Sequence, residues 1–340
     1  MRYKLLGKSG LRVSELALGT MTFGEGWGWG ASKEVSQQIF DAYAKAGGNF
    51  VDTANRYTEG MAEKYVGEFI AADRDHFVLA TKYTLFDRYG DPNFSGNQRK
   101  NMMRSIEASL QRLNTEYIDL FYVHAWDFMT PVEEILRGLD DLVQAGKVLY
   151  VGISDAPAWV VSQANAIADL RGWSRFVGMQ SRYSLVDRAA ERDLLPMARA
   201  LDIGVTAWSV LGSGVLTGKY NKEGGDENGR AAQWGLSERD LAIASEVVKI
   251  SESIGCSPSQ VAMSWVRQQA GVMIPLIGAR KLTQIEDNLG CLQVELNAEQ
   301  MQHLDEVSQI DLGFPHDFLA SNETQDIVYG GTFDSVDLHR

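Results

Sequence analysis

The stretch NFVDTANRY (residues 49–57) is a short apolar run that ends on a carboxylate, with a tyrosine close behind it. Two later segments have the same form: FVLATK (77–82) ends on a lysine, and YIDLFYVH (117–124) ends on a histidine. Short apolar runs of this kind predict the buried strands of a parallel sheet. In a barrel of parallel strands the carboxyl ends meet at one rim, where barrel enzymes carry their catalytic groups. The sequence therefore predicts a barrel enzyme with a polar cluster at its rim.

Five more segments complete the strand pattern on either side of these three. They are ELALGT (15–20), KVLYVGIS (147–154), RFVGMQ (175–180), IGVTAWS (203–209) and VMIPLIG (272–278). Segments with helical periodicity lie between them, and parallel strands need such crossovers. Eight strand–helix units predict one (β/α)8 TIM barrel domain over residues 1–340, preceded by a short N-terminal β-hairpin in residues 3–19. A doubly wound open sheet is the alternative.

Two long segments fall outside this pattern. Residues 221–235 (NKEGGDENGRAAQWG) are polar and rich in glycine, and the tail from Leu312 onward carries Phe314, Pro315 and Phe318 with little periodicity. Long loops of this kind commonly serve as lids or binding loops. We therefore expect both segments to lie at the rim of the barrel.

Composition and charge bound the possible partners. The formal net charge of −13 disfavours nucleic acid or an acidic membrane surface as the main partner. Cys256 and Cys291 provide neither a disulfide framework nor a metal-binding spacing, so we expect no metal site. The sequence shows no export signal and no stretch long enough to span a membrane, which favours a cytoplasmic protein. The oligomeric state stays open.

The strand-end residues Asp52, Lys82 and His124, with Tyr57, are expected to form a proton-transfer group. A free tyrosine has a pKa of about 10, and a nearby ammonium such as that of Lys82 would lower it. Asp52 would be the counter-ion of a buried lysine, and His124 would hydrogen-bond a substrate oxygen. Taken singly, Asp52 could cap a helix, Lys82 could be solvated and His124 could be structural. Their joint placement at strand ends favours catalysis.

Several motifs resemble the aldo-keto reductase superfamily. The segment 52–57, the lysine of LATKY (79–83) and the histidine of FYVHAWD (121–127) are similar to its catalytic tetrad. SVLGSGVLTGKY (209–220) and IPLIGARKLTQIEDNLG (274–290) extend the resemblance to nearly the whole chain, and they are most similar to a soluble bacterial-type branch that also resembles potassium-channel β subunits. The resemblance implies reversible hydride transfer from NADPH to an aldehyde or ketone, with the tyrosine protonating the carbonyl oxygen. The alternative is an NADPH-binding regulatory or sensor subunit with slow catalysis.

The expected cofactor site follows the seventh and eighth strands. No G-x-G-x-x-G fingerprint follows a strand, but the glycines of 209–220 would let the backbone approach a pyrophosphate, beside Lys219. The resemblance places Arg280 on the 2′-phosphate, which favours NADPH over NADH. It also places Asp155 at the nicotinamide carboxamide, where an asparagine is more usual. The full set of expected cofactor residues is Gly19, Thr20, Ser154, Asp155, Gln180, Trp208, Ser209, Leu211, Gly212, Gly214, Lys219, Gly278, Arg280, Gln284 and Asn288.

Aromatic residues just past the strand ends could line an apolar substrate pocket. They are Trp27, Trp29, Tyr83, Trp126 and Phe128. The expected substrate is a small aldehyde or ketone, with aryl aldehydes and sugars among the possibilities.

Overall fold

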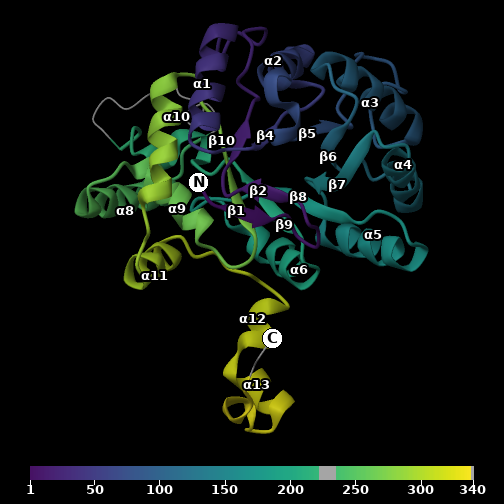
Figure 1. Cartoon of the computed structure of the whole chain (residues 1–340). Helices are drawn as coiled ribbons and strands as arrows, with labels where there is room; N and C mark the ends of the chain where they lie inside the picture. The colour runs from purple at the N-terminus through teal and green to yellow at the C-terminus, as the bar shows by residue number, and fades with distance from the viewer. Residues whose placement is uncertain (222–234, 338–340) are drawn as a thin grey trace.

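The computed structural model describes residues 1–221 and 235–337, which form a closed barrel of eight parallel strands (Figure 1). The strands follow one another round the barrel in the order β10-β3-β4-β5-β6-β7-β8-β9. Their bounds are β3 (Ala17–Gly19), β4 (Phe50–Asp52), β5 (Val78–Tyr83), β6 (Ile118–Val123), β7 (Val148–Ser154), β8 (Phe176–Arg182), β9 (Gly204–Trp208) and β10 (Met273–Ile277). All eight predicted strands are present in the predicted order, so the (β/α)8 barrel is confirmed.

Helices form the outer wall of the barrel (Figure 1). Their bounds are α1 (Lys33–Lys45), α2 (Met61–Ile70), α3 (Arg99–Leu113), α4 (Val132–Gln144), α5 (Ala158–Arg171), α6 (Leu194–Ala200), α8 (Glu238–Ile254), α9 (Pro258–Arg267), α10 (Leu282–Leu289) and α11 (Ala298–Val307). Ser32 caps α1 by accepting a hydrogen bond from the backbone N–H of Val35. None of the helices in the described ranges is long and apolar enough to cross a membrane.

The predicted hairpin, β1 (Tyr3–Leu5) and β2 (Arg12–Ser14), closes the amino end of the barrel. Leu6 and Val13 pack with the side chains inside the barrel. A Cβ atom on Gly204, the first residue of β9, would lie 2.6 Å from Leu6 Cδ1, so a glycine is needed beneath this plug. The carboxyl ends of the strands therefore form the mouth.

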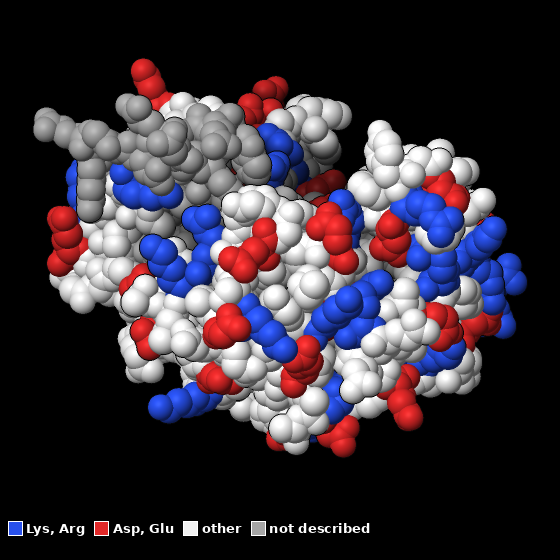
Figure 2. Space-filling model, turned by 90° about the horizontal axis from the view of Figure 1, so that it is seen from above, with Lys and Arg blue, Asp and Glu red and all other residues white. Residues whose placement is uncertain are grey.

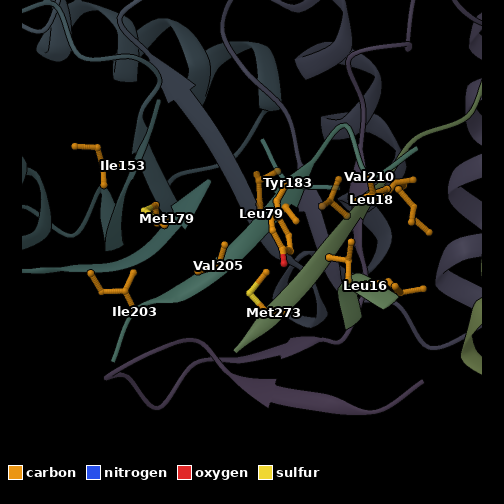
Figure 3. Close-up of a cluster of buried hydrophobic side chains, with 14 of the residues drawn as sticks. Leu16, Leu18, Leu79, Ile153, Met179, Tyr183, Ile203, Val205, Val210 and Met273 are labelled. Carbon is orange, nitrogen blue, oxygen red and sulfur yellow. The ribbon is translucent and has the colours of Figure 1, made fainter. Parts of the chain in front are cut away.

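Side chains alternate along each strand between the barrel interior and the helix layer, as the pleat requires. On β5, Val78 and Ala80 belong to the interior cluster, while Leu79 and Tyr83 belong to the cluster between strands and helices. Figure 3 shows part of this outer cluster, with side chains drawn from several strands. Lys82 has the same parity as Val78 and Ala80, and it therefore points inward at the mouth.

The tail does not form the expected rim loop. Beyond α11 the chain leaves the barrel and forms two short helices, α12 (His316–Ala320) and α13 (Asn322–Tyr329), which stand clear of it (Figure 1). Ser321 caps α13 by accepting a hydrogen bond from Thr324 N. The prediction for residues 221–235 falls almost entirely outside the described residues.

Candidate active site

The four predicted catalytic residues meet at the mouth of the barrel. Lys82 Nζ donates to Asp52 Oδ2 at 2.6 Å and lies 3.3 Å from the Tyr57 hydroxyl. The rings of Tyr57 and His124 are in edge-on contact, with centroids 5.9 Å apart. Lys82 Nζ also donates to the backbone oxygen of Thr53 at 2.8 Å. A buried ammonium thus joins the carboxylate to the phenol, and the imidazole lies beside that phenol.

A strained turn presents Tyr57. The residue begins η1 (Tyr57–Gly60), in which Thr58, Glu59 and Gly60 all have left-handed backbone conformations, with φ of 47°, 54° and 83°. A non-glycine residue held there costs about 1–3 kcal/mol, so the surrounding structure must enforce it. The hydroxyl of Thr58 donates to the carbonyl of Phe23 at 2.7 Å, which ties the turn to the loop after β3.

Lys82 and Asp52 form a buried ion pair, in which the charge of each residue opposes the effect of burial on the pKa of the other. Both side chains are fully buried. Burial disfavours the ammonium of Lys82, but the charges of Asp52 and Tyr57 outweigh burial and raise the pKa of Lys82. Burial raises the pKa of Asp52, and Lys82 opposes that effect. Lys82 therefore stays an ammonium throughout the neutral pH range.

The phenol and the imidazole are both held neutral. Burial raises the pKa of Tyr57; Lys82 lowers it, but not enough to compensate. The expectation that Lys82 would bring the phenol below its ordinary pKa is therefore wrong for the protein without cofactor, because desolvation is the larger effect. Burial and the nearby Lys82 charge lower the pKa of His124 well below its usual value. Its Nδ1 atom has no hydrogen-bond partner among the described residues.

Three of the expected cofactor residues contact Asp52 in this structure. Gln180 Nε2 donates a hydrogen bond to Asp52 Oδ1, so the carboxylate has a donor on each oxygen. Thr20 is fully buried, and its hydroxyl donates to the backbone oxygen of Asp52 at 2.9 Å. Gly19, one residue earlier, pairs with Asp52 across β3 and β4. These residues position the carboxylate of Asp52.

The ends of β7 and β9 supply a second part of the mouth. Ser154 is buried, and Asp155 follows it with a left-handed backbone (φ 44°). The indole N–H of Trp208 donates to Asp155 Oδ1 at 3.3 Å. Burial raises the pKa of Asp155, and the charge of Asp155 in turn raises that of Tyr57. Asp155 is thus close enough to the phenol to influence its charge.

The expected phosphate end lies after β9 and β10. After β9, Ser209 and Leu211 lead into η4 (Gly212–Thr217), where Gly214 takes a φ of 93° and a Cβ atom would lie 3.1 Å from Lys219 Cε. After β10, the N-terminus of α10 has no side-chain cap. Uncapped N–H groups at a helix start favour an anion.

Basic and amide side chains surround that helix start. Arg280 is exposed, and its backbone N–H donates to Gln284 Oε1 at 2.9 Å. Asn288 is buried and donates to the carbonyl of Gly278 at 3.3 Å, which fixes the loop between β10 and α10. The residues present therefore fit a phosphate-bearing cofactor.

The structure separates the five aromatic pocket candidates. Trp27 and Trp29 lie together in the loop after β3, with ring centroids 5.6 Å apart, and Trp126 and Phe128 lie in the loop after β6. Tyr83 does not belong with them. It faces the helix layer, is fully buried, stacks on Phe121 and donates to the carbonyl of Asn97. Its pocket assignment is corrected, because a side chain of outward parity cannot line the mouth.

Two contacts at the site were not anticipated. Thr53 accepts a hydrogen bond from Lys82 with its backbone oxygen. Every residue has such an oxygen, so the sequence could not have identified this contact. Glu59 accepts hydrogen bonds from the indole of Trp27 at 3.1 Å and from Arg56. Its position two residues after Tyr57 was the one available sign that it belongs to the site.

A closed barrel whose mouth joins a buried lysine–aspartate pair to a tyrosine and a histidine defines a class of NAD(P)H-dependent oxidoreductases. The family model for the aldo/keto reductase family matches residues 15–309. The chain belongs to the aldo/keto reductase family.

Curated relatives agree with this assignment. The chain is 38% identical over 337 residues to norsolorinic acid reductase A of Aspergillus parasiticus, covering 95% of this chain and 85% of that protein. It is 36% identical over 342 residues to an aryl-alcohol dehydrogenase [NADP(+)] of Phanerodontia chrysosporium, covering 94% and 89%. A putative aryl-alcohol dehydrogenase of Saccharomyces cerevisiae is similar at the same level, 36%. The bacterial-type, channel-like branch stays a prediction.

Proposed function

We propose that the protein reduces the carbonyl group of a small aldehyde or ketone with NADPH, reversibly, and that Tyr57 is its general acid and base. The observation that carries the proposal is the position of Lys82, whose ammonium lies between the carboxylate of Asp52 (2.6 Å) and the hydroxyl of Tyr57 (3.3 Å). This arrangement stabilises a phenolate after the phenol has released its proton.

Each residue has a distinct task in the proposed reaction. Bound NADPH supplies the hydride. Tyr57, protonated at neutral pH, gives its proton to the substrate oxygen, and Lys82 stabilises the phenolate that remains. Asp52 holds the lysine in place, with Gln180 on its second oxygen. Neutral His124 donates a hydrogen bond to the substrate oxygen and so orients it.

The cofactor would be held by the loop after β9 and by the start of α10. Gly212 and Gly214 allow the backbone to approach a phosphate, and Lys219 adds positive charge. Arg280 beside the uncapped helix start suits the 2′-phosphate of NADPH, because a guanidinium binds phosphate in a bidentate manner. Trp208 offers an aromatic face to the nicotinamide.

Aryl aldehydes are the favoured substrate class. Trp27 and Trp29 lie in the loop after β3, and Trp126 and Phe128 lie in the loop after β6, so two loops after strand ends carry aromatic side chains. Relatives are named as aryl-alcohol dehydrogenases. The names of the relatives, which are reductases and dehydrogenases, do not favour the regulatory alternative.

The test compares Tyr57→Phe with the intact protein. NADPH oxidation would be followed with a panel of aliphatic, aryl and sugar aldehydes, and NADPH binding by fluorescence titration. We expect turnover to fall by about 10²–10⁴-fold while NADPH affinity is kept, because the phenylalanine ring fills the same space without an acidic proton. A near-normal rate would refute the role of Tyr57. Tight NADPH binding without turnover of any carbonyl would refute the enzyme reading.

A further inference from the structure

The C-terminal arm, residues 312–337, makes its interactions with itself. The hydrogen bonds that the structure shows for residues 313–336 all run to partners within 311–336. Its ring contacts, Phe314 with Phe318 and Tyr329 with Phe333, are also internal. The last tie to the barrel is the bond from Arg192 to the carbonyl of Asp311. The arm has its own helices, and among the described residues it shows no hydrogen bond to its own barrel beyond the one at Asp311 (Figure 1).

The arm also exposes an unusual amount of apolar surface. Phe314 is 81% exposed, Ile327 76% and Val328 61%. More than half of the surface of Phe318, Leu319 and Val336 is exposed as well. So many exposed apolar side chains on one short helical segment indicate an interaction site.

The charge of the arm restricts what can cover it. Its sequence contains no lysine or arginine. Its carboxylates are Asp317, Glu323, Asp326, Asp334 and Asp337. Two arms packed against each other would repel, because like charges would be brought together at the interface. The complementary surface must therefore be apolar and basic.

The N-terminal hairpin of the same chain has those properties. On its outer face Tyr3 is 52% exposed and Leu5 54% exposed. The antiparallel register sets Arg12 opposite Leu5, and Arg12 is exposed, as are Arg2 and Lys8.

No carboxylate offsets these charges nearby in the sequence. Residues 1–14 contain no Asp or Glu, and the next residue, Glu15, is buried and paired with Arg267. By contrast, Figure 2 shows a face on which basic and acidic side chains alternate, without a surface of one sign. The hairpin therefore has exposed apolar side chains, as the arm does, and its charge is opposite in sign to that of the arm.

We propose that the arm of one copy docks on the hairpin of a second copy, and that two copies exchange arms reciprocally. Within one copy the arm and the hairpin lie apart (Figure 1). An arm of residues 312–337 has the size of one side of a standard protein interface, which takes about 20–30 residues. Reciprocal exchange gives two such contacts and a closed, two-fold dimer instead of an open filament.

Sedimentation velocity of the full chain at micromolar concentrations tests this proposal. We expect a dimer that dissociates on Ile327→Ser or Arg12→Glu, each weakening the dimer about tenfold or more. Glu323→Lys should weaken it likewise, and combining Glu323→Lys with Arg12→Glu should recover most of the loss. Leu170→Ser is the matched control, since Leu170 is an equally exposed apolar residue (86%) on α5, outside both surfaces. All these positions are exposed and outside the active site, so NADPH binding should not change.

The outcomes are decisive for the proposal. A monomer at these concentrations overturns it, and so does a dimer that ignores the arm and hairpin variants. A dimer sensitive to Ile327→Ser but not to Arg12→Glu shows that the hairpin is not the docking surface. A monomer whose substrate KM changes with Ile327→Ser shows that the arm covers its own mouth, and open polymers exclude reciprocal exchange.

Discussion

Lys82→Met should destabilise the protein strongly, because it leaves Asp52 buried without its counter-ion. Methionine keeps an unbranched side chain of similar length, so the change is chiefly one of charge. Both partners of the pair are fully buried, and Asp52 would keep only the amide of Gln180 on its other oxygen. Removing one partner of a buried pair costs about 3–5 kcal/mol. With a urea m-value of about 3 kcal/mol per molar, the unfolding midpoint should fall by roughly 1–1.7 M.

The loss should depend on pH in a defined direction. Burial raises the pKa of Asp52 even in the intact protein, and Lys82 is the main group that opposes it. Without Lys82 the folded-state pKa rises further above that of the unfolded chain. A carboxyl of this kind favours the folded state while protonated, and this stability is lost as pH rises through the folded pKa. The difference from the intact protein should therefore be larger near pH 8 than near pH 5.

A double variant separates the charge effect from packing. Asp52→Asn combined with Lys82→Met removes both charges and should recover most of the free energy of unfolding, while activity stays low. Urea unfolding at several pH values and NADPH oxidation measure the two properties. A loss below about 1 kcal/mol for Lys82→Met, or the same loss at every pH, would refute the buried-pair argument.

Three other changes test separate parts of the structure. Gly67→Ala should destabilise the protein by about 1–3 kcal/mol in urea unfolding, despite the better helix propensity of alanine. The reason is that a Cβ atom at position 67 would lie under 3.0 Å from the carbonyl of Leu113. Gly10→Ala is the control and should be neutral, because no atom lies within 4 Å of a Cβ atom there. The pKa of His124 is lowered in the folded protein, so its contribution to stability is present above the unfolded pKa and is lost as pH falls. Between about pH 7.5 and 5.5, the free energy of unfolding of the intact protein should therefore fall by about 1.4 kcal/mol more than that of His124→Gln. An equal fall for the two proteins would contradict a neutral imidazole. Arg280→Ala should weaken NADPH far more than NADH in fluorescence titration, and equal weakening would remove the 2′-phosphate assignment.

The alternation of strand side chains explains why much of the site could be predicted from the sequence. Asp52, Lys82 and His124 come at strand ends with inward parity, so apolar runs that end on a polar residue identify them. Gln180 and Trp208 have the same parity, but they were expected from the family resemblance. The same pattern identified all eight strands, because each strand is a short apolar run between helices.

The predictions that failed depend on the face to which a side chain points or on how much water the fold excludes, and a pattern of residue types shows neither. Tyr83 directly follows Lys82, so it lies equally near the strand end but on the opposite face. The raised pKa of Tyr57 depends on how much water the barrel excludes, which a residue type does not express. Helix α13 of the arm begins at a local cap, Ser321, in a segment of weak periodicity.

The N-terminal hairpin, which closes the amino end of the barrel, cannot reach its final position until later strands have been synthesised. The hairpin is synthesised well before the strands that it contacts, because Lys4 donates to the carbonyl of Met273 at 2.7 Å and Leu6 lies against Gly204. At about 5–20 residues per second, the 269 residues that separate Lys4 from Met273 take roughly 13–54 seconds to synthesise. Until then Leu6 and Val13 have no complete barrel to fill. A nascent chain therefore exposes the apolar side chains of Leu6 and Val13 until β9 and β10 have been made, and during that period they are open to non-native apolar contacts.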